Sequence, residues 1–214
     1  LTLKKKKLII IPISGFLCDR IRVGFEPSPV IRPPDAAQGN FKVYKRPYCE
    51  DFLEYCLENF DVAIWSSARS WNVMGALKCI DEKLIKKLLF TWTQDDCIET
   101  AFCTPENPDK KIFLRDLRKV WQRRWRGGIK YSSSDILMLE DEPSKCLLSP
   151  ANTSIFIPKY EASMTDDNYL GPASPLRSFL DGLVNARDVP SYVKQNPFGS
   201  DGISEGHPDW NYYQ

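Results

Sequence analysis

The chain's longest apolar run reads Leu8-Ile9-Ile10-Ile11-Pro12-Ile13-Ser14-Gly15-Phe16-Leu17. Its first part, residues 8–13, is rich in β-branched isoleucine and follows a cluster of lysines, which predicts a strand buried on both faces. Strands of that kind are typical of parallel sheets. Pro12, Ser14 and Gly15 interrupt the run, which is far shorter than the roughly 20 apolar residues of a membrane-spanning helix. We therefore predict a buried strand and no membrane segment.

The composition is that of an ordinary globular domain. The 214 residues are 43% hydrophobic and 27% charged, which provides enough apolar material for one substantial core. A net charge of +1 does not favour nucleic-acid binding as a general role. The seven cysteines contain no C-x-x-C pair, and their odd number favours buried, reduced thiols. The one histidine, His207, stands in a polar segment, so we expect neither imidazole catalysis nor a histidine-rich zinc site.

Short apolar runs alternate with amphipathic stretches along the chain. We predict strands at residues 8–13, 61–65, 88–92, 136–139 and 154–157. We predict helices from Pro47, from a cap at Ser70 to about residue 80, over residues 114–125 and 176–184, and a short one from Pro143. The proline-rich residues 24–39 and the polar residues 95–108 are expected to be irregular.

This alternation of strands and helices predicts an α/β fold, a Rossmann-like parallel sheet with helices on both faces. We assign it to a domain of residues 1–185, followed by a partly irregular extension of residues 186–214. In such a sheet, ligands bind beyond the carboxyl ends of the strands. Residues 12–15, 66–69 and 140–142 each follow a predicted strand, so we expect them to converge in one crevice.

Four further blocks stand in a fixed order along the chain: Arg46-Pro47-Tyr48, Ile64-Trp65-Ser66-Ser67, Leu114-Arg115-Asp116-Leu117 and Leu139-Glu140-Asp141-Glu142-Pro143. Together with the first strand they make the chain similar to the haloacid dehalogenase superfamily. Within it, the chain resembles the RNA polymerase C-terminal-domain phosphatases, also called NLI-interacting-factor-like phosphatases. The resemblance covers residues 4–160, and the later segment resembles a plant branch of that family.

The resemblance implies a D-x-D-x-T motif after the first strand, where one aspartate attacks phosphorus and the second transfers protons. In this chain the nucleophile position is Pro12, the acid–base position is Ser14 and the threonine position is Phe16. The phosphate-binding hydroxyl falls on Ser66 and the phosphate-binding cation on Arg115. The acids that complete a magnesium site fall on Glu140 and Asp141.

Proline carries no nucleophilic atom, and the hydroxyl of Ser14 is too weakly acidic to replace a carboxylic acid. We therefore expect a pseudophosphatase with no catalytic residues, with no cofactor or only weakly bound magnesium. Its partner is expected to be a protein or a phosphopeptide rather than nucleic acid, in the nucleus or the cytoplasm. Two alternatives stay open: a residual magnesium-dependent phosphoserine/phosphothreonine phosphatase of the aspartyl-phosphate type, and a presequence binder like the mitochondrial translocase receptor if an upstream segment is missing. The sequence does not specify the oligomeric state.

For three other features we prefer a structural role to a functional one. Asp19, the next carboxylate along the chain, is interpreted as a surface residue. The basic residues between 115 and 130, which alternate with Trp121 and Trp125, are interpreted as a solvated helix face rather than a surface for nucleic acid or acidic peptides. Lys4 to Lys7 is only weak support for a nuclear-import signal.

Overall fold

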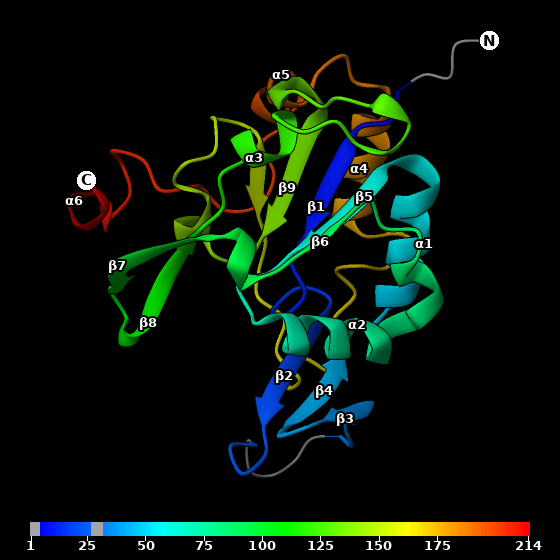
Figure 1. The fold of residues 1–214 in the computed structure, drawn as a ribbon, viewed down its shortest axis with the longest axis vertical. Helices are drawn as coiled ribbons and strands as arrows, with labels where there is room; N and C mark the ends of the chain where they lie inside the picture. Colours follow the sequence, from blue (N-terminus) through cyan, green and yellow to red (C-terminus); the bar gives the residue numbers. More distant parts are fainter. Residues whose placement is uncertain (1–4, 27–31) are drawn as a thin grey trace.

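A five-stranded parallel sheet forms the centre of the computed structural model, which describes residues 5–26 and 32–214 (Figure 1). Its strands are β1 (Leu8–Ile11), β5 (Asp61–Trp65), β6 (Thr91–Trp92), β9 (Ile136–Glu140) and β10 (Ser154–Phe156), in the order β10-β9-β1-β5-β6. β1 lies in the middle and pairs in parallel with both β5 and β9. The predicted α/β parallel-sheet fold is thus confirmed. Lys4, Pro27 and Pro29 lie outside the described residues.

The side chains of β1 alternate between two apolar layers, which explains why all four residues of the strand are buried. Ile9 and Ile11 belong to one core cluster, and Leu8 and Ile10 belong to another on the opposite face. Full burial of such a side chain stabilises the fold by roughly 1.5–3 kcal/mol. The first cluster is completed by α1 (Cys49–Asn59), α2 (Ser70–Ile85), α4 (Pro175–Asn185) and α5 (Val189–Gln195). The second face is covered by α3 (Arg118–Trp121) and by aromatic residues that include Trp92 and Trp125.

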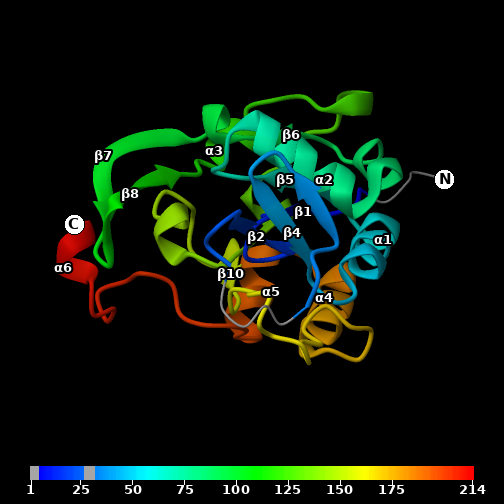
Figure 2. The same cartoon turned by 90° about the horizontal axis from the view of Figure 1, so that it is seen from below.

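Two accessory sheets differ from the sequence expectation. β2 (Cys18–Arg22), β3 (Ala36–Gln38) and β4 (Phe41–Lys45) form an antiparallel sheet in the order β2-β4-β3. β7 (Ile98–Thr104) and β8 (Asn107–Leu114) form a hairpin where an irregular excursion was predicted. Their strands are mostly exposed or half-buried, so ladder hydrogen bonds rather than a buried face define them and the hydrophobic pattern is weak. The three-stranded sheet lies beyond the arrowheads of the central strands, and the hairpin projects to one side (Figures 1 and 2).

Several helix boundaries also differ from the predictions. α2 begins at Ser70 but its N-cap is Arg69, which makes no side-chain cap bond, so the predicted cap at Ser70 is wrong. That helix runs to Ile85 across a non-helical Asp81. The predicted helix over residues 114–125 is reduced to the four residues of α3. Short 3₁₀ helices η1 (Gln94–Asp96), η2 (Arg126–Gly128), η3 (Ser133–Asp135) and η4 (Pro143–Cys146) lie in the connections. Among the described residues, no helix is long and apolar enough to span a membrane.

The segment after β10 is fastened to the first half of the chain by two ion pairs, each of which involves a buried arginine. The guanidinium of Arg46 donates to both carboxylate oxygens of Asp167, at 2.8 and 2.7 Å, between the rings of Tyr160 and Tyr169. A second arginine, Arg177 of α4, pairs with Asp51 of α1. At the end of the chain, α6 (Trp210–Tyr213) lies against the β7–β8 hairpin, where the hydroxyl of Tyr212 donates to the carbonyl of Cys103 at 2.8 Å (Figure 2). This later segment is therefore packed onto the sheet domain.

Candidate functional site

The carboxyl ends of three neighbouring strands, β1, β5 and β9, place the candidate residues at one edge of the sheet. Directly after β1 the backbone forms a compact turn, in which the carbonyl of Ile13 accepts from the amides of Phe16, Leu17 and Cys18 at 3.2, 2.8 and 3.1 Å. Pro12 is buried in this turn, and Ser14 is exposed. The turn therefore presents neither a carboxylate nor an aligned row of free amides.

Gly15 brings this turn into direct contact with Asp141. Its φ of +79° lies in the region that favours glycine, and a Cβ at this position would lie 2.2 Å from Oδ2 of Asp141. The tail also reaches the turn, since the amide of Tyr160 donates to the carbonyl of Gly15 at 2.8 Å. The structure thus brings together the turn after β1, which contains Pro12 and Ser14, and one of the two predicted metal acids.

Ser66 follows β5 and lies at the same edge, where both its side chain and its backbone form hydrogen bonds. Its Oγ accepts from the amide of Ala68 at 3.1 Å, and its amide donates to the carbonyl of Trp92 at 3.0 Å. Only 6% of the residue is exposed. The Sγ of Cys97 lies 3.9 Å from the carbonyl oxygen of Ser66. Burial raises the pKa of this thiol, and the nearby positive charge of Arg115 partly opposes that shift.

Arg115, the predicted phosphate-binding cation, forms an ion pair with Glu140, the predicted metal acid. Both side chains are closed to solvent, with 1% and 0% exposed. Burial lowers the pKa of the Arg115 guanidinium, but arginine stays protonated near neutral pH. The two residues that the resemblance assigns to phosphate and to magnesium therefore neutralise each other.

Lys145 is the residue of this edge that the sequence analysis missed. Its Nζ lies 3.3 Å from Oε1 of Glu140, 3.4 Å from Oδ1 of Asp141 and 3.6 Å from Oε2 of Glu142. The spacing of three and four residues from Glu142 and Asp141 was an available signal, because side chains at that spacing share one face of a helical turn. The 3₁₀ turn η4, which contains Lys145, directs the ammonium back to the end of β9.

The residues at this edge do not fit a magnesium site. The two positions after β1 that would supply carboxylates are Pro12 and Ser14, and the remaining acids are already paired with Arg115 and Lys145. Nearby Asp116 is also occupied, because it binds Arg118 at 2.8 Å. Within residues 5–26 and 32–214, no three His, Cys, Asp or Glu side chains are grouped so that they could hold a metal ion.

The other candidate residues lie outside this edge. Asp19 is half-buried in β2, and its carboxylate accepts from the amide of Ala162 at 2.9 Å, so its interpretation as a simple surface residue is wrong. Trp121 and Trp125 pack against the second core cluster, and the ring of Trp125 stacks on Phe90 at 4.6 Å.

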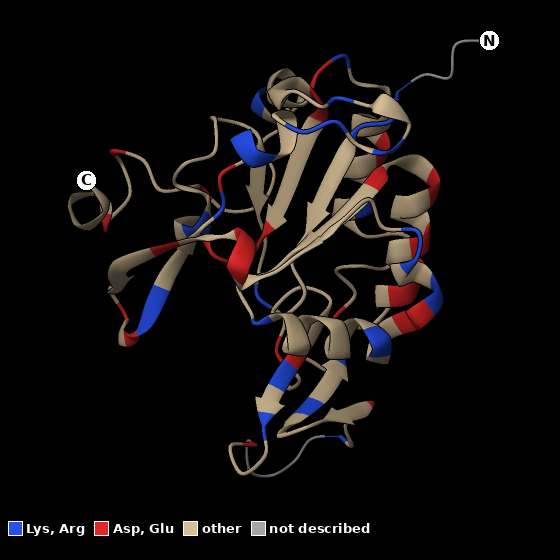
Figure 3. Cartoon of the chain, viewed as in Figure 1, with Lys and Arg blue, Asp and Glu red and all other residues tan. Residues whose placement is uncertain are grey.

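Basic side chains of the segment 118–130 remain largely exposed around those tryptophans, on α3 and on the loop at the amino ends of the central strands (Figure 3). This arrangement agrees with the interpretation of a solvated basic face. Arg115 is not part of that face, since it is buried.

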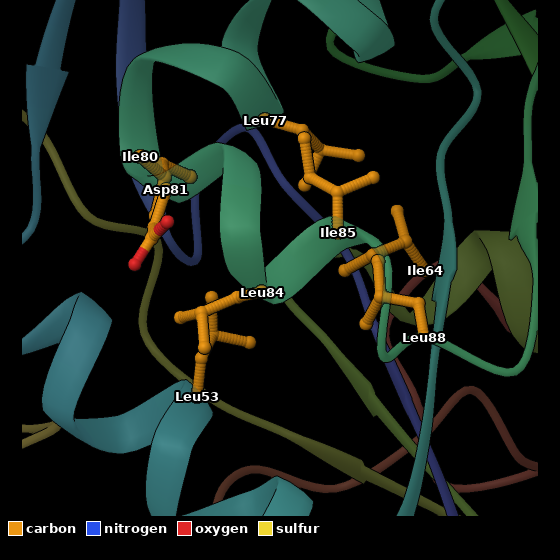
Figure 4. A pocket seen from close by; sticks show the side chains of 8 residues that line it. All are labelled: Leu53, Ile64, Leu77, Ile80, Asp81, Leu84, Ile85 and Leu88. Carbon is orange, nitrogen blue, oxygen red and sulfur yellow. The ribbon is translucent and has the colours of Figure 1, made fainter.

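A small cavity lies away from the candidate site, between α1, α2 and β5 (Figure 4). Seven of its lining residues are apolar, among them Leu53, Ile64 and Leu84, and the eighth is Asp81. It holds no convergent set of polar groups, so it does not resemble a substrate site.

Comparison with known proteins identifies relatives across most of the chain. The sequence model of the family described as NLI interacting factor-like phosphatase matches residues 7–190. An uncharacterized FCP1 homology domain-containing protein of Schizosaccharomyces pombe is 27% identical over 203 residues, which cover 90% of this chain and 78% of that protein.

Two solved structures share the fold at low sequence identity. A beryllium-fluoride-bound variant of the fission yeast RNA polymerase II CTD phosphatase Fcp1 matches with a TM-score of 0.51 and 12% identity, over 83% of this chain and 51% of that chain. A second structure of Fcp1, an essential RNA polymerase II CTD phosphatase, matches with a TM-score of 0.50 and 14% identity, over 87% of this chain and 56% of that chain. The chain thus spans about half the length of these Fcp1 chains.

Proposed function

Because the chain belongs to the NLI interacting factor-like phosphatase family, we propose that it is a pseudophosphatase that acts by binding a protein partner. In this proposal the phosphatase-like domain keeps its fold and has lost the aspartyl-phosphate reaction. The observation that carries the proposal is the buried ion pair between Arg115 and Glu140, at the edge where Pro12 stands in the nucleophile position.

Pro12 and Ser14 support the loss of chemistry. An aspartyl-phosphate needs a carboxylate oxygen to form the new bond to phosphorus, and neither proline nor serine supplies one. Loss of a covalent nucleophile costs on the order of 10⁴- to 10⁶-fold in turnover, judging by serine proteases. The family's acid–base step is lost as well, because the Ser14 hydroxyl does not release its proton near neutral pH.

The charge balance of the edge supports weak or absent phosphate binding. A phosphoryl group would need cations that are free to face it. Arg115 is held by Glu140, and Lys145 is surrounded by acids, so neither cation is free to face a phosphoryl group. We therefore favour an unmodified protein partner over a phosphopeptide, and we propose no magnesium requirement.

Exposed aromatic side chains support the protein-binding half of the proposal. Trp71 and Phe25 are 76% and 72% exposed, and aromatic side chains are enriched in protein–protein interfaces. Both lie beside the three-stranded sheet: the Nε2 of Gln38 in β3 donates to the carbonyl of Trp71 at 2.9 Å, and Arg22 at the end of β2 lies over the ring of Phe25. The seven cysteines are all free, which supports a reducing compartment such as the nucleus or the cytoplasm.

Phosphatase activity is tested with p-nitrophenyl phosphate and with a phosphoserine peptide, each with and without magnesium. We expect no turnover above the background and no trapped phosphoryl-protein. Robust hydrolysis that an Asp141→Asn change abolishes, and that Ser14→Ala leaves intact, would instead establish the residual phosphatase.

Partner binding is tested by quantitative pull-down of the natural protein and of two matched aromatic variants. Trp71→Ala should weaken capture of the specific partner. Phe102→Ala, which removes a 67% exposed aromatic side chain from the β7–β8 hairpin, should not. Equal capture by all three proteins would count against the three-stranded sheet as the binding side. Arg115→Ala is unsuitable for this test, because it would leave Glu140 buried without its arginine.

A further inference from the structure

Three carboxylates converge on one ammonium group at the end of β9. Lys145 lies within 3.6 Å of Glu140, Asp141 and Glu142, and only 13% of its side chain is exposed. An ammonium in this position balances negative charge at short range, which is the role that a bound cation has in a cluster of acids.

A backbone hydrogen bond fixes Lys145 beside the second buried cation. The amide of Arg115 donates to the carbonyl of Lys145 at 2.9 Å, so β8 and η4 hold the two cations as neighbours. Glu140 is shared between them, because its Oε2 pairs with Arg115 and its Oε1 faces Lys145. On the outer side, Lys110 binds the third acid, Glu142, at 2.6 Å. Three cations therefore face three carboxylates.

Both carboxylate oxygens of Asp141 lie against other groups of the protein. Its Oδ1 faces Lys145, and its Oδ2 lies against the backbone of Gly15. A divalent cation entering here would meet the positive charge of Lys145 at contact distance, with little water to screen the repulsion. It would also have to retain several waters in a space that the turn after β1 already occupies.

We propose that Lys145 is a built-in counter-ion that replaces a divalent metal at Glu140 and Asp141, so that this acid cluster excludes magnesium. The inference deepens the proposed function and rests on it, because the family's phosphatase reaction needs a divalent ion at this edge. It also predicts that the site returns when the ammonium is removed, since Glu140 Oε1 and Asp141 Oδ1 would then lose their positive neighbour. Glu140 Oε1 would still accept from the amides of Asp141 and Glu142, at 3.0 and 3.4 Å, and has lone-pair capacity beyond these bonds. Two carboxylates with water are sufficient to hold magnesium in many proteins.

The test is titration of Mn²⁺, a paramagnetic substitute for magnesium, followed by electron paramagnetic resonance. We expect no saturable site in the natural protein at millimolar Mn²⁺, and a single saturable site in Lys145→Gln with at least about tenfold tighter binding, as expected for loss of one charge at contact distance. Lys145→Arg keeps the charge and should bind no Mn²⁺. Lys110→Gln is the matched control, because it removes a lysine that, among the described residues, forms its ion pair with the outer acid Glu142, and it should also bind none.

Two outcomes would overturn the proposal. One is stoichiometric Mn²⁺ binding by the natural protein with paramagnetic broadening centred on the amides of Gly15 and Asp141, a measurement that needs no variant. The other is a folded Lys145→Gln protein, verified by circular dichroism, that gains no site. The phosphatase assay separates the two proposals. Hydrolysis without a metal ion would overturn the proposed pseudophosphatase function but not the role of Lys145 as a counter-ion. Metal binding without hydrolysis would overturn the counter-ion role but not the pseudophosphatase function.

Discussion

Arg115 pairs with Glu140 inside the protein, and neither side chain is accessible to solvent beyond 1%. The resemblance to the family assigns Arg115 to phosphate binding and Glu140 to metal binding. Paired with each other, they leave no net charge for a ligand to recognise. Their energetic role is then that of any buried ion pair, in which each partner depends on the other.

Removing one member of the pair should therefore destabilise the protein strongly. We expect Glu140→Gln to lower the free energy of unfolding by about 3–5 kcal/mol, because the guanidinium stays buried without its counter-charge. The double variant Arg115→Met, Glu140→Met should cost clearly less than Glu140→Gln alone. Urea denaturation measures both. Glu99→Gln serves as the control, since its pair with Lys111 is 55% exposed on both sides and its loss should lie within experimental error.

Restoring the two motif aspartates should not restore an enzyme. We expect the Pro12→Asp, Ser14→Asp variant to hydrolyse p-nitrophenyl phosphate at most slightly. Without a free cation for the phosphoryl oxygens, its rate should stay at least on the order of 10²-fold below that of an intact site. Initial rates at saturating magnesium measure this, with the natural protein as the blank. Turnover comparable to an intact family phosphatase would show that Arg115 is available after all.

A methyl group at Gly15 should be much more damaging than one at another glycine of similar backbone conformation. Gly15 and Gly24 have φ values of +79° and +87°, but a Cβ at Gly15 would meet Asp141 at 2.2 Å, whereas a Cβ at Gly24 would meet no atom of the described residues within 4 Å. Gly24→Ala should cost about 1–2 kcal/mol through backbone strain alone. Gly15→Ala should cost more, and the difference in melting temperature isolates the contact. Equal losses would show that the turn moves away from Asp141 without cost.

Tyr48 should carry backbone strain that glycine would relieve. It has a φ of 64°, where a side chain crowds the backbone, and it is the N-cap of α1. We expect Tyr48→Gly to be more stable than Tyr48→Ala by about 0.5–1 kcal/mol, which is the strain less the extra chain entropy of glycine. Both variants lose the ring, so their difference in thermal unfolding reports on φ alone. A more stable alanine variant would contradict the assignment of strain.

Buried thiols should make the protein less stable in alkali. Burial raises the pKa of Cys18 to about 12 and raises the pKa values of Cys49 and Cys56 as well, from a usual value of 9.0. Below pH 9 the thiols are neutral in both states. As the pH rises from 9 towards 12, only the unfolded chain ionises, so the free energy of unfolding falls by about 1.4 kcal/mol per pH unit for each thiol.

Urea denaturation at pH 8 and pH 10.5 measures this slope, and Cys56→Ala should make it shallower. Iodoacetamide at pH 8 should leave the three buried thiols unmodified in the native protein. An unchanged slope in Cys56→Ala would show that other groups, such as tyrosines, control the alkaline transition.

The central sheet was predictable because hydrophobic pattern alone specifies strands that are buried on both faces. β5 has the predicted bounds and β1 and β9 nearly so, and their order placed Ser66, Glu140 and Asp141 at one edge. The accessory strands were not predictable in this way. Lys110 and Lys111 in β8, for example, are solvated side chains in an exposed hairpin that hydrogen bonds define.

The electrostatic state of the candidate site also required the structure. The resemblance assigns Arg115 to phosphate binding, but the sequence alone does not show that Glu140 pairs with its guanidinium. Apart from its spacing from the nearby acids, nothing in the sequence distinguishes Lys145 from the other lysines, because its contacts follow from the backbone of η4, which turns its side chain towards Glu140 and Asp141. The sequence shows which residues are charged, but it does not show which of them form ion pairs.

The ion pair between Arg46 and Asp167 links residues 121 positions apart in the sequence. It therefore sets a minimum length for a stable phosphatase-like domain. A shortened protein ending ahead of Asp167 would have to enclose a guanidinium with no opposite charge beside it. Such a fragment would open around Tyr160 and expose the turn at Phe16, and it would tend to self-associate. The segment that contains Asp167 is therefore a structural part of the domain.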